Sequence, residues 1–535
     1  MAEMQQGRVM RAAALLMASM IISRVLGYVR DMVMYPMFGQ GAVTDAFTAA
    51  FLIPNFLYQI IIGGAISAAF IPVFSSYLAK DDHRNAWQIS NIVISWAMLL
   101  MSVGVVAAYI FAPQIMASFV SGYDAKTLAL TVVLTRIMLL QPVFMALSGL
   151  SMGILHSHQH FLWPAVGSML YNMFIVLAGA FLAGPIEARY PGFGIVGFSV
   201  GVVSGAIAYF LVQIPALLHA GFRYHPSLNT HHPGFLRLIH LLIPVLIGLS
   251  VKQINFIVNT KLASGLAVGS VAALNLAQKF MNVPIYVFAS AIAVAIFPTI
   301  TRQAALSDMP EFKKSVSMGI RSVAFICIPA AVGLIVLREP IIRLLFEFRG
   351  AQFIASDTVY AGQALLFYCL GLTFYGVVDV LLRAFYAQQN TKTPVLVSVG
   401  AMAANMVFSL ILVRLMGLGG LALAYSLAGT LQCTVLILLL RLRIGHMDLH
   451  RIVISFAKTL IISLLMGAVA IGAAHAIATL LDVTVSKTAQ IIQLGGSMGL
   501  AVLVFFALAY FLRMEEAQIA ISMFKRRKTA RRGDY

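Results

Sequence analysis

Four cationic side chains interrupt segments that are otherwise apolar: Arg24, Arg30, Lys252 and Lys279. The first two belong to the stretch SRVLGYVRD, late in an apolar run that extends from about residue 10 to residue 38. A charged side chain at bilayer depth costs about 3 kcal/mol on insertion scales, so such residues usually face a protein interior or a water-filled space. Arginine binds phosphate or carboxylate through two parallel hydrogen bonds, and lysine adds a mobile point charge. The pattern therefore predicts a binding site for an anion inside a membrane protein.

One carboxylate accompanies the first two cations. Asp31 lies seven residues after Arg24, which places both on one helix face, and Gly27 between them permits a bend. Arg30 points about 120° away from Arg24 at 100° per residue. We expect Asp31 to pair with one arginine and to leave the other for a ligand.

Amide side chains form polar stripes on three further apolar segments. The stripes comprise Asn275, Gln278, Lys279 and Asn282; Lys252, Asn255 and Asn259; and Asn55, Tyr58 and Gln59 after Pro54. Each set recurs at the spacing of one helix face, which predicts a common polar surface. The alternative is structural, because amides also hold membrane helices together, and Asp379 and Arg383 are spaced to neutralise each other on one helix.

The expected ligand is an amphiphile. A small hydrophilic anion does not need so wide an apolar periphery, whereas a phosphorylated head group on a lipid tail does. Its head would occupy the polar space while its tail stays in the membrane.

The amino-acid composition indicates which class of protein holds these residues. Of 535 residues, 61% are hydrophobic and 10% are charged, against about 25% charged in a soluble protein. The chain is therefore predicted to be an all-α integral membrane protein. The three cysteines are far apart within apolar runs, and three histidines in HSHQH lack clustered acids, so neither a metal site nor another cofactor is expected.

The net charge of +18 does not indicate a nucleic-acid partner, because much of it gathers in the final residues. There Lys525, Arg526, Arg527, Lys528, Arg531 and Arg532 fit a cytoplasmic tail near anionic lipid head groups. Most other Lys and Arg residues between the apolar segments fall on the same side as this tail. Both termini are accordingly predicted to be cytoplasmic.

A helix needs roughly 20 apolar residues to cross a bilayer, and about fourteen such segments follow one another along the chain. We place them at residues 10–38, 45–79, 86–112, 126–156, 160–183, 193–220, 235–262, 268–301, 315–337, 357–388, 393–415, 417–441, 452–480 and 489–512.

Three sequence echoes suggest one six-helix unit used twice. AAFIPVFSSY resembles VAIFPTITRQ, GILHSHQHFLWPAV resembles RAFYAQQNTKTPVL, and GFGIVGFSVG resembles GLGGLALAYS, at separations of 225 to 230 residues. An even number of helices gives two parallel repeats. The predicted domains are residues 1–222 and 223–445 as two six-helix lobes, 446–512 as two additional helices, and 513–535 as a basic tail.

Several motifs together resemble one family. SRVLGYVRD, TDAFTAAFLIPN, GGAISAAFIPVFSSY, QINFIVNT and FYAQQNTKTPV occur in the order typical of the MurJ (MviN) family, lipid II flippases of the MOP exporter superfamily. The resemblance extends from about residue 8 to residue 440. It implies two lobes around a cationic cavity that opens alternately to either side, with the last two helices forming a groove for the undecaprenyl tail.

The resemblance also implies site residues, a substrate and a location. By motif match, Arg24, Arg30, Asp31, Asp45 and Asn55 are functional, and the polar stripes add Lys252, Asn255, Asn259, Lys279 and Asn282 as substrate-binding candidates. The implied partner is the undecaprenyl-pyrophosphate-linked peptidoglycan precursor lipid II, flipped to the outer leaflet of the bacterial cytoplasmic membrane during cell-wall synthesis. Membrane lipids are further partners, and a coupling ion and cell-wall synthesis proteins stay open.

Two sites depart from the family pattern. Tyr58 and Gln59 occupy positions where many members carry arginines. The pattern ADRLMEFP is replaced by AQKFMNVP, so that Gln278, Lys279 and Asn282 keep the cation and lose two acids.

One alternative function stays open, and others fit the sequence less well. A flippase for another undecaprenyl-linked glycan would need the same pyrophosphate and tail contacts, whereas a multidrug antiporter for organic cations should have acids and aromatics in its cavity. A membrane-embedded transferase needs paired carboxylates or metal-binding acids, which are scarce here, so the chain is not expected to be an enzyme. A scaffold without transport would not keep costly buried charges.

Overall fold

The computed structural model is built from helices. It describes residues 2–59, 70–445, 448–483 and 486–518, and the side chains of residues 2–18, 20 and 243–252 lie outside this description. Two compact units, Met1–Ala272 and Ala273–Tyr535, are each considered by themselves. No strand occurs among the described residues. This agrees with the expected all-α architecture, because a helix satisfies its own backbone hydrogen bonds in lipid.

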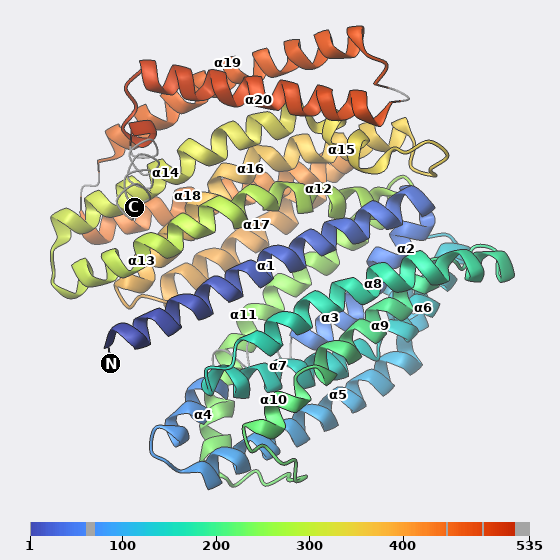
Figure 1. The fold of residues 1–535 in the computed structure, drawn as a ribbon, viewed down its shortest axis with the longest axis vertical. Coiled ribbons are helices and arrows are strands. Elements are labelled where there is room, and N and C mark those ends of the chain that lie inside the picture. The colour runs from blue at the N-terminus through green and yellow to red at the C-terminus, as the bar shows by residue number, and fades with distance from the viewer. Residues whose placement is uncertain (1, 60–69, 446–447, 484–485, 519–535) are drawn as a thin grey trace, which may run out of the picture. The chain divides into compact units, whose positions relative to one another are not determined.

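Eleven α-helices that lie within the first unit are found in its described residues (Figure 1). They are α1 (Ala2–Phe38), α2 (Ala42–Ala50), α3 (Leu52–Tyr58), α4 (Ile71–Leu78), α5 (His83–Phe119), α6 (Ala125–Met138), α7 (Gln141–Ser157), α8 (Leu162–Arg189), α9 (Val196–Leu211), α10 (Ile214–His219) and α11 (Pro233–Ser264).

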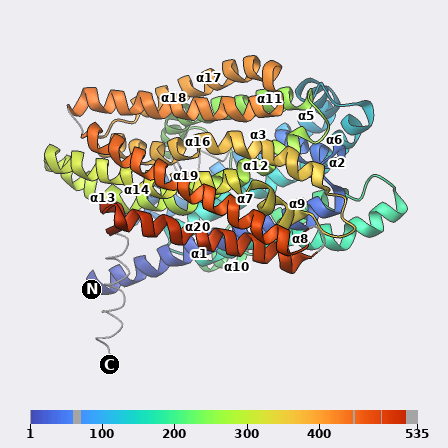
Figure 2. The ribbon, with the colours of Figure 1, turned by 90° about the horizontal axis from the view of Figure 1, so that it is seen from above.

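The next helix, α12, begins at the end of the first unit and leads into the second. The elements from there on are α12 (Ser270–Pro284), the π-helix η3 (Ile285–Ala289), α13 (Ser290–Ala305), α14 (Met309–Val336), α15 (Arg338–Phe346), α16 (Ala355–Ala387), α17 (Lys392–Met416), α18 (Leu418–Ile444), α19 (Leu449–Leu480) and α20 (Lys487–Phe511). In Figure 2, α19 and α20 run side by side as a hairpin.

Each of the fourteen predicted spans overlaps one or more of these helices, and residues 60–69 of the second span lie outside the described residues. Within the described residues, eleven helical segments are long and apolar enough to cross a membrane. The remaining three predictions fall on α1, on α2 to α4, and on α11, each of which includes residues or side chains outside the description. The chain is therefore a multi-pass helical membrane protein.

Polar residues set several helix boundaries. The carboxylate of Asp82 accepts a hydrogen bond from the backbone of Asn85 at the start of α5, and Ser486 accepts one from Ala489 at the start of α20. Such caps satisfy N–H groups that have no partner within the helix. A π-turn follows Pro284, where the ring removes a donor from the helical ladder.

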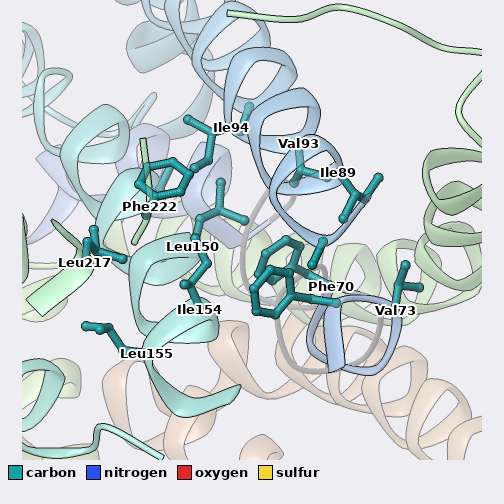
Figure 3. Packing of buried hydrophobic residues seen from close by; sticks show 14 of the residues in the cluster. Phe70, Val73, Ile89, Val93, Ile94, Leu150, Ile154, Leu155, Leu217 and Phe222 are labelled. Carbon is teal, nitrogen blue, oxygen red and sulfur yellow. The ribbon is translucent and has the colours of Figure 1, made fainter. Parts of the chain in front are cut away.

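A large apolar core of the first unit lies between α4, α5 and α7 (Figure 3). Phe70 and Phe74 stack with ring centroids 5.5 Å apart, and Trp87 packs against Phe74. Ile89 and Leu150 are fully or almost fully buried in the same cluster. This packing holds α4, α5 and α7 against one another.

Glycines allow two helix hairpins to pack closely. A Cβ atom on Gly201 of α9 would lie 2.7 Å from the Cα of Ile175 in α8. In α18, a Cβ on Gly420 would lie 2.1 Å from the carbonyl oxygen of Leu412 in α17. Both glycines lie in the segments of the third sequence echo, but at different positions within it. The repeat and its boundary at residue 222 stay predictions.

Candidate substrate-binding site

Late in α1, Arg30 and Asp31 form an ion pair. Nε and Nη2 of Arg30 both donate to Oδ1 of Asp31, at 3.1 and 3.0 Å. Asp31 is 1% exposed at its side chain and Arg30 is 16% exposed. Among the described residues, Nη1 of Arg30 donates no hydrogen bond. The Asp31 carboxylate therefore orients the Arg30 guanidinium. The expected pairing of Asp31 with one arginine is formed with Arg30, and the role of either arginine in ligand binding stays a prediction.

Arg24 lies about two turns earlier in α1 and is exposed. The neighbouring Ser23 donates to the carbonyl of Ser168 at 3.1 Å, and Asn172 donates to the Ser23 hydroxyl at 3.0 Å. These bonds join α1 to α8 next to the arginine. They restrict the rotation of α1 and so define the direction in which Arg24 leaves the helix.

Asp45, in the first turn of α2, is bound by backbone. Its Oδ2 accepts the N–H of Gly269 at 2.8 Å and its Oδ1 accepts the N–H of Ala272 at 2.7 Å. The residue is 3% exposed. Hydrogen bonds from N–H groups at a helix start to a carboxylate are charge-assisted and strong. Asp45 therefore fixes the start of α12 against α2.

Gly269 is required at this junction for two reasons. Its φ of +89° is in the region that favours glycine, and a Cβ atom there would lie 2.4 Å from the carbonyl oxygen of Gln40. The adjacent backbone is held from α1, because the Tyr35 hydroxyl donates to the carbonyl of Ala272 at 3.1 Å. Our sequence interpretation missed Gly269 and Tyr35; the turn GLAVGS was the available signal for the glycine.

The amide candidates of the first unit are half-buried. Asn55 lies on α3, directly after Pro54. On α11, the side chain of Asn259 donates to both the carbonyl oxygen and Oδ1 of Asn255, at 2.9 and 3.0 Å. The predicted shared face is thus a contact between two amides. Lys252 is on the same helix, but its side chain lies outside the described residues.

In the second unit, Lys279 and Asn282 are half-buried on α12. Their neighbour Gln278 is in hydrogen-bond contact with Tyr425 of α18. Tyr425 in turn stacks on Tyr375 of α16, with centroids 4.7 Å apart. The glutamine that replaces a family acid is therefore held by an aromatic pair, which the sequence did not indicate because the partners come from distant helices.

The predicted ion pair between Asp379 and Arg383 is wrong. Asp379 accepts a hydrogen bond from the Ser290 hydroxyl at 2.6 Å, while the Arg383 guanidinium lies over the ring of Phe297 at 5.4 Å. The short carboxylate reaches a hydroxyl on the neighbouring helix, and the long arginine side chain reaches an aromatic face instead.

The described residues contain no group of three metal-binding side chains. In the HSHQH segment, the His158 ring stacks on Trp87 at 5.5 Å, and the His156 ring packs against Phe161 at 5.0 Å. These two histidines thus contribute to aromatic packing at the end of α7.

Solved structures first define the class of the protein. A MurJ lipid II flippase in an inward closed conformation matches with a TM-score of 0.76 and 26% identity, covering 94% of this chain and 99% of that one. An inward-facing multidrug-resistance MATE transporter of the MOP superfamily shares the fold, with a TM-score of 0.64 at 16% identity over 81% of this chain and 98% of that one. The chain is thus a multi-pass helical protein with the fold of MOP-superfamily transporters.

Sequence relatives identify the family. The family model described as lipid II flippase MurJ matches residues 34–512. A probable lipid II flippase MurJ of Vibrio cholerae serotype O1 is 32% identical over 94% of this chain and 96% of its own length. A lipid II flippase MurJ of Burkholderia cenocepacia is 29% identical over 79% of this chain and 82% of its own. The chain belongs to the MurJ family.

Proposed function

We propose that this chain flips lipid II from the cytoplasmic to the outer leaflet of the bacterial cytoplasmic membrane by alternating access. The observation that carries the proposal is Arg30, a guanidinium oriented by a buried carboxylate within an apolar helix and with Nη1 still available. A membrane protein keeps such a costly group where an anionic ligand uses it. The pyrophosphate of lipid II is that anion.

The site residues take three roles in this proposal. Arg24, Arg30, Lys252 and Lys279 bind the pyrophosphate, and Asn55, Asn255, Asn259 and Asn282 donate hydrogen bonds to the head group. Asp31 orients Arg30. Asp45 belongs to the site as a positioning residue, because backbone amides occupy both of its carboxylate oxygens.

Binding of the anion drives the transport cycle in this scheme. Cations brought together in a medium of low dielectric constant repel one another. The pyrophosphate neutralises this repulsion and lowers the free energy of the closed state, which shifts the population toward it. The undecaprenyl tail meanwhile follows the α19–α20 hairpin, both termini lie in the cytoplasm, and a coupling ion and cell-wall synthesis proteins are the further partners proposed.

The test is flipping by the purified full-length chain in vesicles. Lipid II in the inner leaflet should become accessible at the outer leaflet faster than in vesicles without protein, and Arg30→Gln should abolish the acceleration. The surface variant Lys314→Gln is the matched control, since the Lys314 side chain is 69% exposed and pairs with Glu311, which is also exposed. Acceleration for a different undecaprenyl-pyrophosphate glycan but not for lipid II would assign the chain to that substrate instead.

A further inference from the structure

Arg321 is a cation in an apolar helix that the proposed substrate site does not use. It lies on α14, with its side chain 11% exposed. Its Nη1 is 2.9 Å from Oε2 of Glu515 and 3.2 Å from Oε1 of Glu516. Both glutamates follow the end of α20, so the arginine connects a helix of the second unit to the end of the C-terminal hairpin.

Glu516 extends this connection to a third element. Its side chain is 5% exposed, and its Oε1 also accepts the hydroxyl of Ser455 in α19 at 2.9 Å. Phe325 of α14, Ile462 of α19 and Met514 after α20 belong to one buried apolar cluster. Removal of one partner from a buried ion pair leaves an uncompensated charge. The cluster therefore holds α14, α19 and the end of α20 in one arrangement.

A second polar contact lies at the other end of α20. Nζ of Lys487 donates to the carbonyls of Arg343 and Leu344 at 3.1 and 2.9 Å, in the last turn of α15. It also lies 4.1 Å from the ring centroid of Phe348. A cation at a helix C-terminus satisfies carbonyls that have no partner in the helix and interacts favourably with the helix dipole.

The two contacts are a membrane thickness apart. The 25 residues of α20 span about 37 Å at 1.5 Å per residue, which exceeds the hydrocarbon core of about 30 Å. Between its ends the hairpin packs on α14 through apolar contacts, such as Gly467 against Val332. Helices in lipid gain no hydrophobic driving force from association, so polar contacts at the ends have a large influence on their position.

The outer faces of the hairpin are apolar over the same length. Leu464 of α19 is 57% exposed and Leu503 of α20 is 70% exposed. This surface suits a polyprenyl chain, and its position depends on the two polar contacts.

We propose that Arg321 and Lys487 are positioning residues that fasten the α19–α20 hairpin to α14 and α15 at the two ends of α20, so that it holds a polyprenyl tail as a fixed part of the second unit. The inference rests on the proposed function for its substrate. The head group then moves through the site while the tail stays with one unit. Neither residue contacts the head group in this account.

The experiment compares two substrates in vesicles that contain the full-length chain. Arg321→Gln and Lys487→Gln should each lower the flipping rate of undecaprenyl lipid II about tenfold, equivalent to about 1.4 kcal/mol, and leave a lipid II analogue with a short prenyl chain unaffected. Lys314→Gln is again the matched control. A purely structural role would lower both rates equally, and this result, or no change for either substrate, would overturn the inference.

A second measurement does not depend on transport. Amide hydrogen exchange in residues 449–455 and 509–518 should increase in the Arg321→Gln variant, because these backbone segments lose their anchor on α14. Unchanged exchange overturns the inference even if the parent flips lipid II. If the parent flips neither substrate but exchange increases as expected, the proposed function fails while the fastening stands, and its assignment to a polyprenyl tail is withdrawn.

Discussion

Arg30 and Arg321 are both arginines in apolar helices, and they use their charge differently. Arg30 pairs with its immediate neighbour Asp31, whereas Arg321 pairs with glutamates that follow it by 194 and 195 positions. A pair within one helix orients the guanidinium without joining it to another element. A pair between distant segments fastens them together. We propose on this basis that Arg30 binds a ligand and that Arg321 fastens helices.

The largest expected effect tests the local pair. Arg30→Gln removes the guanidinium that donates twice to the buried Asp31 carboxylate and should lower the free energy of unfolding by about 3 kcal/mol. The double variant Arg30→Gln/Asp31→Asn removes both charges and should recover most of that loss, yet it should not flip lipid II. Thermal unfolding in detergent and flipping in vesicles measure the two quantities; a double variant that transports normally would make the pair structural.

The corresponding double change at Arg321 should also recover stability, but it should keep transport of a short-chain substrate. Arg321→Gln/Glu516→Gln should recover stability relative to Arg321→Gln, since the buried Glu516 charge is removed as well and the remaining Glu515 is 61% exposed and solvated. It should also flip a short-chain lipid II analogue at the parent rate. Loss of short-chain flipping in this stable variant would place Arg321 in the head-group site and remove the contrast with Arg30.

Asp45 should show an intermediate effect. Asp45→Asn replaces one of the two oxygens that accept backbone N–H groups with a donor, which should cost about 1 to 3 kcal/mol for the unsatisfied amide. We expect a lower thermal transition and a slower flipping rate with an unchanged apparent affinity for lipid II. A weakened affinity at normal stability would instead indicate direct contact between Asp45 and the substrate.

Gly269→Ala should destabilise the same junction by about 1 to 2 kcal/mol, because alanine is disfavoured at its positive φ and its Cβ meets the Gln40 carbonyl. Gly400→Ala is the control. No atom lies within 4 Å of a Cβ at Gly400, which is inside α17, and the change should leave stability equal or higher. Equal unfolding temperatures for the two variants would contradict the account of the turn.

The smallest expected effect concerns the thermal stability of the protein at acidic pH. A hydrogen bond from Arg321, and then its charge, hold the pKa of Glu515 below its ordinary value of 4.5. A lowered folded-state pKa adds stability that is complete above 4.5 and is lost as the pH falls through the folded-state value. Glu515→Gln should therefore lower thermal stability slightly at pH 7 and reduce the decline below pH 4.5 by the same small amount, because both reflect the loss of one ion pair. An unchanged acid profile would show that the exposed Glu515 contributes nothing to the fastening.

Hydropathy predicted the helical segments because lipid requires each one to be apolar over a full membrane thickness. Local spacing likewise predicted that Asp31 pairs with one arginine. The spacing of Asp379 and Arg383 wrongly predicted an ion pair, because the two side chains instead contact Ser290 and Phe297 of α13. Spacing within one helix gives no information about partners from other helices.

Asp45 shows the same limit for the site itself. Its motif predicted importance, but its role depends on amides at Gly269 and Ala272, more than 220 residues later. The Gln278 contact with Tyr425 also depends on tertiary structure. Charge and amide patterns thus predicted many site candidates, while only the fold distinguishes ligand-binding groups from those that position a helix.

The most direct test is growth of bacteria depleted of their own lipid II flippase. The parent chain and the stable Arg30→Gln/Asp31→Asn variant are expressed at equal membrane levels, with Lys314→Gln as the control. We predict that the parent and Lys314→Gln sustain wall synthesis and that the double variant does not. Growth supported by the double variant would contradict the central role of Arg30, and failure of the well-inserted parent would contradict the assignment to lipid II.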